Sequence, residues 1–472
     1  MNDDSRFASV LPGTLQHALE YLEGLPEAPV GARVGLDELR TRLNRPLPKE
    51  GAEAKRVIDA LVRDCRDGLT DSPGGRFFAW VIGGSVPAAL AADWLTSTWD
   101  QNAGMFTVAP AAAVVEEVVG AWLLTLLRLP ASASFALVTG CQMAHVTCLA
   151  AARNGVLAQQ GWDVEEKGLM GAPPIRVITG DQRHGTIERA MRILGLGRSA
   201  IVDIPVAEDG QLKPEPLKEA LSSNSGLPTI LLLQAGDINT GSFDPFLELI
   251  PIAKDHQAWV HVDGAFGLWA NASPDYRQLC AGVELADSWA TDGHKWLNVP
   301  YDCGYAFVAD SEAHYRSFSH RASYLNHSDE ARDQVDWNPE YSRRGRGFAS
   351  YAAIASLGSD GIADLVTRCC RFAKRIVVEA SQIPGVEATW VPLLNQGLLR
   401  FLEPGGEAED HDRRTERVAQ RIVDSGEAYF ACTSWRGMRC MRVSVCGWQT
   451  DDEAVTRTVA AIRSSLSTDE TS

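Results

Sequence analysis

The middle of the chain alternates between short apolar runs and helical patterns, and this alternation constrains the fold more than any other feature. Apolar runs of strand length occur at 135–138, 175–179, 229–234 and 258–262, and helical patterns follow the first three at 142–154, 186–194 and 246–256. Strands that alternate with helices build βαβ units around a mostly parallel sheet. Binding sites in such sheets lie just beyond the carboxyl ends of the strands. The predicted fold class is therefore α/β, with the chemistry at that edge.

The remaining segments suggest three parts. Residues 1–55 contain one short helical pattern and a stretch interrupted by Pro and Gly, which predicts an N-terminal arm. Residues 56–320 form the predicted large domain. After residue 320 the pattern changes to a long helix followed by short strands and helices, so residues 321–472 are predicted to form a small C-terminal α+β domain.

The composition argues against several classes of function. The chain has 44 basic and 61 acidic residues and a net charge of -17, whereas a nucleic-acid-binding surface needs basic patches. Its ten cysteines show no C-x-x-C pair and no zinc-ligand spacing, so we expect free thiols, no metal site and a cytoplasmic protein. The apolar stretch at 111–129 carries Glu116 and Glu117 and is amphipathic, which argues against a membrane span. The N-terminal residues show no signal-peptide pattern.

Two segments at predicted strand ends carry the strongest chemical signal. Trp-Val-His-Val-Asp-Gly-Ala at 259–265 ends an apolar strand in Asp263, and Thr-Asp-Gly-His-Lys-Trp at 291–296 places Lys295 after another strand. Pyridoxal 5'-phosphate (PLP) needs such a pair, because a lysine amine forms a Schiff base with it and a carboxylate keeps its pyridine nitrogen protonated. An isolated Asp or Lys is more often a turn cap or a surface residue. The two motifs together in a βαβ chain favour PLP.

With His-Val-Asp-Gly-Ala, Ala-Asp-Ser and His-Lys-Trp, the chain resembles the group II PLP-dependent amino-acid decarboxylases, in particular the aromatic-L-amino-acid decarboxylases. The resemblance covers residues 76–447 or so. It implies PLP fold type I, which is the aspartate-aminotransferase-like fold, and a homodimer with the active site at the subunit interface. It also implies that Lys295 forms the Schiff base, that Asp263 bonds the pyridinium, that Ala265 lies under the ring and that His294 stands beside the lysine.

Further positions around the ring follow from the same resemblance. His184, in Asp-Gln-Arg-His-Gly-Thr, lies between a predicted strand and a helix. A lone histidine is more often structural, but the matching family histidine stacks on PLP near the substrate carboxylate. In the segment at 236–244, Ile238 replaces a threonine that approaches the ring hydroxyl in the family, and Asn239 or Thr240 is the candidate substitute.

The phosphate of PLP is expected at the start of the helix after residue 139, because backbone N–H groups at a helix N-terminus bind anions. The family usually has small hydroxyl residues there, and this chain has Gly140, Cys141 and Gln142. Without the other motifs, this segment would read equally well as a tight strand-to-helix turn. Asp292 matches a family position near the phosphate.

Four residues are candidates for substrate contacts. Trp80, in Phe-Phe-Ala-Trp at 77–80, and Phe106 match family segments that line the substrate entrance, although core packing explains such aromatic residues equally well. Arg442 lies where fold type I enzymes often bind a carboxylate, for which guanidinium is suited. Tyr324 belongs to a loop discussed next.

The loop before Arg343 and Arg344, which match an arginine pair of the family, departs from the family pattern. In aromatic-amino-acid decarboxylases a tyrosine of this loop returns a proton to Cα, and here Tyr324 and His327 are only the nearest candidates. We predict decarboxylation of an L-amino acid with a sizeable apolar or aromatic side chain. The alternatives are a retro-aldol carbon–carbon lyase and an aldehyde-forming oxidative decarboxylase; an aminotransferase or a non-catalytic scaffold is less favoured.

Overall fold

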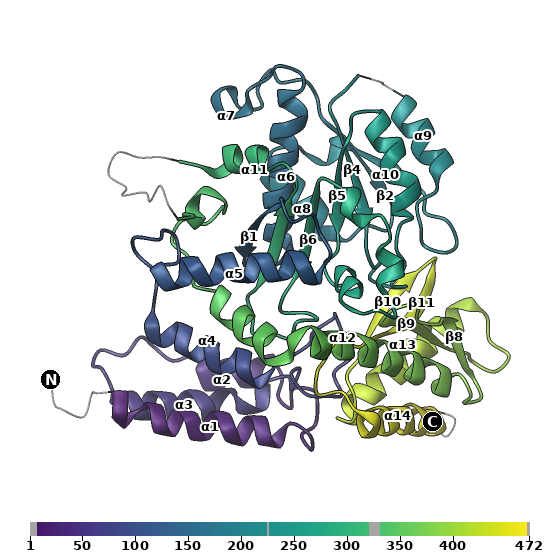
Figure 1. Cartoon of the computed structure of the whole chain (residues 1–472). Coiled ribbons are helices and arrows are strands. Elements are labelled where there is room, and N and C mark those ends of the chain that lie inside the picture. The colour runs from purple at the N-terminus through teal and green to yellow at the C-terminus, as the bar shows by residue number, and fades with distance from the viewer. Residues whose placement is uncertain (1–6, 224–225, 321–330, 470–472) are drawn as a thin grey trace.

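A seven-stranded sheet forms the centre of the molecule in the computed structural model, which describes residues 7–223, 226–320 and 331–469 (Figure 1). The strand order is β1-β7-β6-β5-β4-β2-β3. Within the described part of this sheet, the antiparallel pairs are those of β7 with β1 and β6. The mostly parallel sheet predicted from the alternation is confirmed. Its strands are β1 (Ser134–Val138), β2 (Arg176–Gly180), β3 (Ile201–Ile204), β4 (Thr229–Gln234), β5 (Trp259–Asp263), β6 (Ser288–Asp292) and β7 (Gly304–Val308).

Helices cover both faces of this sheet, because its strands carry apolar side chains on both sides. One face packs against α6 (Cys141–Ala158), α7 (Val164–Lys167), α8 (Gly185–Ile193) and α11 (Ser311–Phe318). The other face packs against α5 (Pro110–Leu126), α9 (Pro214–Ser222), α10 (Phe246–Asp255) and α12 (Gly347–Ala380).

Helix α6 packs directly on the sheet, and small side chains allow the contact. At Gly155, a Cβ atom would come within 2.7 Å of the Trp259 ring on β5. Thirteen residues of α6 are buried, and the polar ones among them include His145 and Asn154. The close approach brings the N-terminus of α6 to the carboxyl ends of β5 and β6, where the site is expected.

The C-terminal part builds a second, smaller sheet, in the order β10-β11-β9-β8 and antiparallel throughout. Helix α12 connects the two parts and runs from beside α4 (Pro87–Trp99) and α5 toward the small sheet (Figure 1). The predicted small α+β unit is therefore present. It contains β8 (Val386–Trp390), β9 (Gln396–Phe401), β10 (Ala431–Trp435), β11 (Met438–Ser444), α13 (Ala408–Asp424) and α14 (Asp452–Asp469).

The first three α-helices of the chain are α1 (Leu11–Gly24), α2 (Leu36–Leu43) and α3 (Ala54–Cys65), drawn in purple in Figure 1. They leave a row of large apolar side chains exposed, namely Leu11, Leu15, Leu19, Val57 and Leu61. The domain boundaries after residues 55 and 320 stay predictions. Among the described residues, no helix combines the length and the hydropathy that crossing a bilayer requires.

Candidate active site

One cavity of about 280 Å³ lies at the carboxyl ends of β4, β5 and β6, next to the N-terminus of α6. Nine of the residues singled out from the sequence line it together. A larger, open hollow of about 710 Å³ lies beside Trp80 and Tyr429 and contains neither Lys295 nor Asp263. The residues that line the smaller cavity are Thr139, Gly140, Cys141, Gln142, His184, Thr186, Gln234, Gly236, Ile238, Asp263, Ala265, Phe266, Asp292, His294 and Lys295.

Asp263 is the last residue of β5 and is buried at the floor of the cavity. Its Oδ1 accepts a hydrogen bond of 3.1 Å from the N–H of Ala265, and its Oδ2 lies 3.5 Å from Nε2 of His145. Burial on its own would raise the pKa of Asp263, but His145, His184 and Lys295 outweigh it and hold that pKa below the usual range. The carboxylate is therefore ionised, as a partner of a pyridinium must be.

Lys295 faces the same cavity from the turn after β6. Its Nζ lies 3.1 Å from Oδ2 of Asp292 and 5.9 Å from the ring centroid of Phe266. Burial lowers the pKa of the amine, but the nearby carboxylates of Asp292 and Asp263 raise it above its usual value. The structure thus holds an ammonium group between two carboxylates that end adjacent strands.

The N-terminus of α6 also lines the cavity, next to Asp292. Oδ1 of Asp292 accepts a hydrogen bond from the backbone N–H of Cys141, and Nε2 of His294 lies 3.5 Å from the same oxygen. Gly140 leaves room for His294, because a Cβ there would lie 3.1 Å from its Cε1. Both polar atoms of the Gln142 side chain are buried without a hydrogen-bond partner among the described residues. An unsatisfied amide beside a helix N-terminus suits a ligand with strong acceptors, such as a phosphate.

His184 borders the open side of the cavity as the N-cap residue of α8. Its Nδ1 lies 2.8 Å from Oγ1 of Thr186, which fixes the direction of the ring. Partial burial lowers the pKa of the imidazole, against the opposing effect of Asp263. A neutral, oriented ring at this place can lie flat against a planar ligand.

Other predicted residues lie elsewhere in this single chain. Asn239 does not line the cavity, although its neighbours Gly236 and Ile238 do. Its Oδ1 instead accepts a 3.0 Å hydrogen bond from Oγ1 of Thr433. Trp80 is 52% exposed and packs beside Tyr429 at the larger hollow.

The remaining substrate candidates have different surroundings. The backbone N–H of Phe106 donates to Oδ1 of Asp333 at 2.8 Å. Arg442, on β11, is buried, and its Nε has no hydrogen-bond partner among the described residues. Tyr324 and His327 lie outside the described residues.

Arg343 and Arg344, the arginine pair that matches the family, make ion pairs away from the cavity. Nη1 of Arg343 donates to both carboxylate oxygens of Glu116, at 2.8 and 2.9 Å, and Nη2 donates to the carbonyl of Leu137. Both charged side chains are buried, so the amphipathic stretch at 111–129 directs one of its two glutamates inward. Arg344 instead pairs with Asp93 at 2.8 Å, close to the surface.

Sequence reasoning did not single out several residues of the site. Thr186 and Phe266 line the cavity next to residues that were singled out. The ring of Tyr301 stacks on His294, with 4.1 Å between centroids, and no motif indicates this contact. Cys141, His145 and Asp263 place three potential ligand atoms within 4.8 Å of one another, which cysteine spacing could not reveal because the three residues come from α6 and β5.

Comparison with known families decides the assignment. The model of the pyridoxal-dependent decarboxylase conserved domain matches residues 37–383. The chain belongs to this family. It is thus a PLP-dependent carboxy-lyase, and the predicted family, cofactor and enzyme class are confirmed.

Comparisons with individual proteins agree with this family assignment. The chain is 26% identical over 427 residues to 4-hydroxyphenylacetaldehyde synthase of Rhodiola rosea, covering 87% of this chain and 85% of that protein. It is 27% identical over 314 residues to aromatic-L-amino-acid decarboxylase of Bacillus atrophaeus, covering 66% and 63%. The crystal structure of Oryza sativa TDC with PLP and tryptamine superposes with a TM-score of 0.92 at 24% identity, covering 99% of each chain. That likeness confirms the PLP fold type I architecture expected from the sequence.

Proposed function

We propose that this enzyme decarboxylates an aromatic L-amino acid with PLP bound to Lys295. The observation that carries the proposal is one cavity that contains both a buried, ionised Asp263 and the amine of Lys295. The substrate class is supported by similar proteins, which include tyrosine decarboxylase 2 of Arabidopsis thaliana and the Bacillus atrophaeus enzyme.

The residues of the cavity fit the three functional ends of PLP. Gln142, the N-terminus of α6 and the neighbouring His294 suit the phosphate. Asp263 suits the pyridine nitrogen, and Lys295 suits the aldehyde. When bound, PLP supplies an electron sink for the electron pair that remains at Cα after CO2 leaves.

The side chains of the chain itself position the substrate and its protons. His184, neutral and oriented by Thr186, would cover one face of the cofactor, with Ala265 on the other face. As a neutral imidazole, His184 would itself add no positive charge that stabilises the scissile carboxylate. The buried guanidinium of Arg442 has an Nε without a hydrogen-bond partner among the described residues and is the candidate for binding the substrate carboxylate.

We propose further that the enzyme is a homodimer in the cytoplasm. The exposed apolar side chains of α1 and α3 form a surface of the kind that another subunit covers. A second subunit would also explain why Trp80 and Phe106 lie away from the cavity of their own chain. All ten cysteines lie in the described part of the chain and are free thiols, the state that a reducing cytoplasm maintains.

A second candidate is oxidative decarboxylation to an aldehyde. The sequence has no tyrosine at the loop position that returns a proton to Cα in the aromatic-amino-acid decarboxylases. The similar proteins also include phenylacetaldehyde synthase of Arabidopsis thaliana. Both observations are compatible with oxidation at Cα by oxygen as well as with protonation of Cα.

One experiment separates these reactions. The purified, PLP-saturated enzyme is incubated with each of the twenty amino acids and with common aromatic derivatives, and CO2, amine, aldehyde and peroxide are all measured. Equal amounts of amine and CO2 from an aromatic substrate support the proposal. Aldehyde with CO2 and peroxide supports the oxidative route, and aldehyde without CO2 indicates retro-aldol cleavage. Failure of every substrate to release CO2 would overturn both decarboxylation reactions.

A further inference from the structure

Behind Asp263, a chain of buried polar side chains runs from the cavity into the core between α6 and the large sheet. It consists of His145 on α6, His261 and Trp259 on β5, and Ser288 on β6. His145, His261 and Ser288 are completely buried. Buried polar groups are costly unless their hydrogen bonds are satisfied, so a chain of them at this place needs an explanation.

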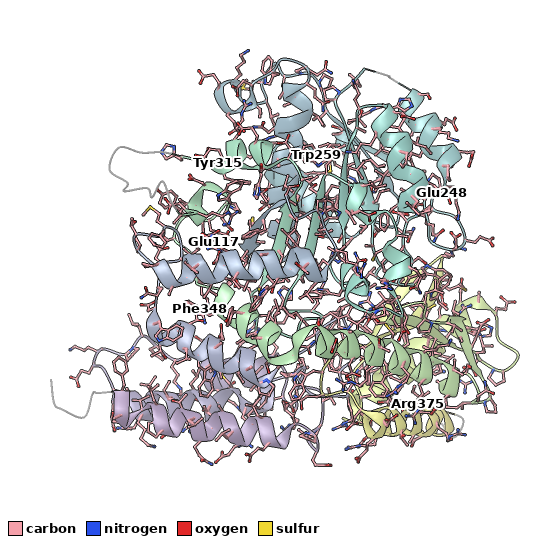
Figure 2. The ribbon with its side chains drawn as sticks, viewed as in Figure 1. Glu117, Glu248, Trp259, Tyr315, Phe348 and Arg375 are labelled. Carbon is pink, nitrogen blue, oxygen red and sulfur yellow. The ribbon has the colours of Figure 1, made fainter. Side chains whose placement is uncertain are left out.

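The alternation of β5 produces this arrangement. Residues two apart on a strand point to the same face, so Trp259, His261 and Asp263 share one face, while Val260 and Val262 pack on the other. That shared face is the one that α6 covers (Figure 2, where Trp259 is labelled). His261 is paired with Ser288 in the register between β5 and β6.

The distances link the side chains into a continuous path. Nε2 of His145 lies 3.5 Å from Oδ2 of Asp263, and Nδ1 of His145 lies 3.0 Å from Nε2 of His261. Nδ1 of His261 lies 2.9 Å from Oγ of Ser288, which also accepts a 2.9 Å hydrogen bond from the indole N–H of Trp259.

The chemistry of the two ends limits where the protons are. Burial lowers the pKa of His261 to about 3, so this ring is neutral near pH 7. If the Ser288 hydroxyl donates to Nδ1 of His261, then Nε2 of His261 donates to His145, and Nε2 of His145 carries a proton. If Nδ1 of His261 donates to Ser288 instead, Nδ1 of His145 donates to Nε2 of His261. The first arrangement points the Nε2–H of His145 at Asp263, which as an ionised carboxylate can only accept.

The thiol of Cys141 does not provide an alternative acceptor of equal strength. Its Sγ lies 3.4 Å from Nε2 of His145. Burial first, and then the charges of Asp292 and Asp263, raise the pKa of this thiol well above its ordinary value, so it stays uncharged. The charged oxygen of Asp263 is therefore the stronger partner for the His145 N–H.

We infer that His145, oriented by His261 and Ser288, is a positioning residue that keeps Asp263 ionised and directed at the cofactor nitrogen. The inference rests on the proposed role of Asp263. Without the His145 N–H, a buried carboxylate beside a pyridinium would take the proton itself, because a neutral pair costs less than an ion pair in a dry site. The donor from His145 stabilises the carboxylate charge and so leaves the proton on the ring nitrogen.

The test compares His145→Leu, which removes the donor, with His145→Gln, which keeps an N–H donor without a titratable ring. His314→Gln is the matched control, since His314 is also fully buried and bonded to a serine, Oγ of Ser134 at 2.8 Å, but lies on α11 outside the cavity. Two properties are measured in buffers with a metal chelator: the dissociation constant of PLP from the protein, and the 15N chemical shift of the ring nitrogen of bound, labelled PLP.

We expect His145→Leu to weaken PLP binding on the order of ten- to a hundredfold, the value of a hydrogen bond to a charged group. Its ring-nitrogen signal should move toward that of an unprotonated pyridine. His145→Gln should lie between it and the native enzyme, and His314→Gln should match the native enzyme. If His145→Leu does not fold, His261→Phe carries the same test, because it removes the ring that orients the His145 donor.

Asp263→Asn, measured in parallel, separates this inference from the proposed function. If Asp263→Asn loses the protonated ring nitrogen but the His145 and His261 variants keep both it and native PLP affinity, the inference is overturned and the role of Asp263 stands. If Asp263→Asn itself keeps a protonated ring nitrogen, the proposed role of Asp263 fails, and the inference fails with it.

Discussion

Replacing Asp263 by Asn removes one charge and little else. The side chain keeps its size, and its carbonyl can still accept the 3.1 Å hydrogen bond from Ala265. What is lost is the negative charge that His145, His184 and Lys295 stabilise at this buried position. We therefore expect Asp263→Asn to fold and to fail in catalysis.

The expected loss of activity follows from the role of the Asp263 charge in catalysis. Removing one preorganised group that stabilises transition-state charge in a dry site costs about two to three powers of ten in rate. Partial loss of the ring proton adds to this, so we expect kcat/KM to fall by about two to four powers of ten, or about 3–5 kcal/mol of transition-state stabilisation.

The assay is CO2 release from the best aromatic substrate at saturating PLP, so that weaker cofactor binding does not mimic slower chemistry. Asp310→Asn is a suitable control, because Asp310 caps α11 by accepting from the N–H groups of Glu312 and Ala313, and Asn caps helices equally well. A kcat/KM for Asp263→Asn within threefold of the native value would refute the reasoning.

Three further predictions concern stability and substrate binding. Arg343→Met leaves Glu116 as a buried, unpaired carboxylate and should lower the free energy of unfolding by about 3–5 kcal/mol in urea titrations; an unchanged midpoint would contradict it. Burial lowers the pKa of His314 from 6.5 to about 3, so the stability that this neutral ring contributes is present above pH 6.5 and is lost as the pH falls toward 3. His314→Gln should accordingly show a flatter dependence of stability on pH over that range, and curves of equal slope would count against it. Arg442→Met should raise KM for the amino acid at least about tenfold while the PLP affinity stays native, as expected for a lost charged contact; an unchanged KM would remove Arg442 from the substrate site.

Local pattern predicted the sheet well where each strand is followed by its own helix. The strand at 229–234 agrees with β4 at both ends, and the helix expected at 142–154 is the central part of α6. Strands β3 and β7 were not expected: β3 has only four residues, and β7 runs antiparallel between β1 and β6 without an α-helix between β6 and itself in the chain. Helix α2 was not expected either, since Pro and Gly on both sides make its segment resemble a loop.

The residues of the site that could be predicted are those that belong to short motifs at the ends of predicted strands. Lys295, Asp263 and His184 converge because parallel strands end at one edge. The contact of Tyr301 with His294 depends on how the segment between β6 and β7 folds. The path from Asp263 through His145 to His261 depends on how α6 lies over β5, which a single sequence does not reveal. The Trp-x-His-x-Asp alternation of β5 was the available signal for that path.

The identity of the residue that binds the cofactor is the most direct test of the account. The PLP-loaded enzyme is reduced with borohydride and digested, and the peptides are analysed by mass spectrometry. We expect one pyridoxyl-phosphate group on the peptide that contains Lys295, and none after the same treatment of Lys295→Ala. A label on another lysine of the native enzyme, or a reducible link that survives in Lys295→Ala, would contradict the assignment of this cavity as the active site.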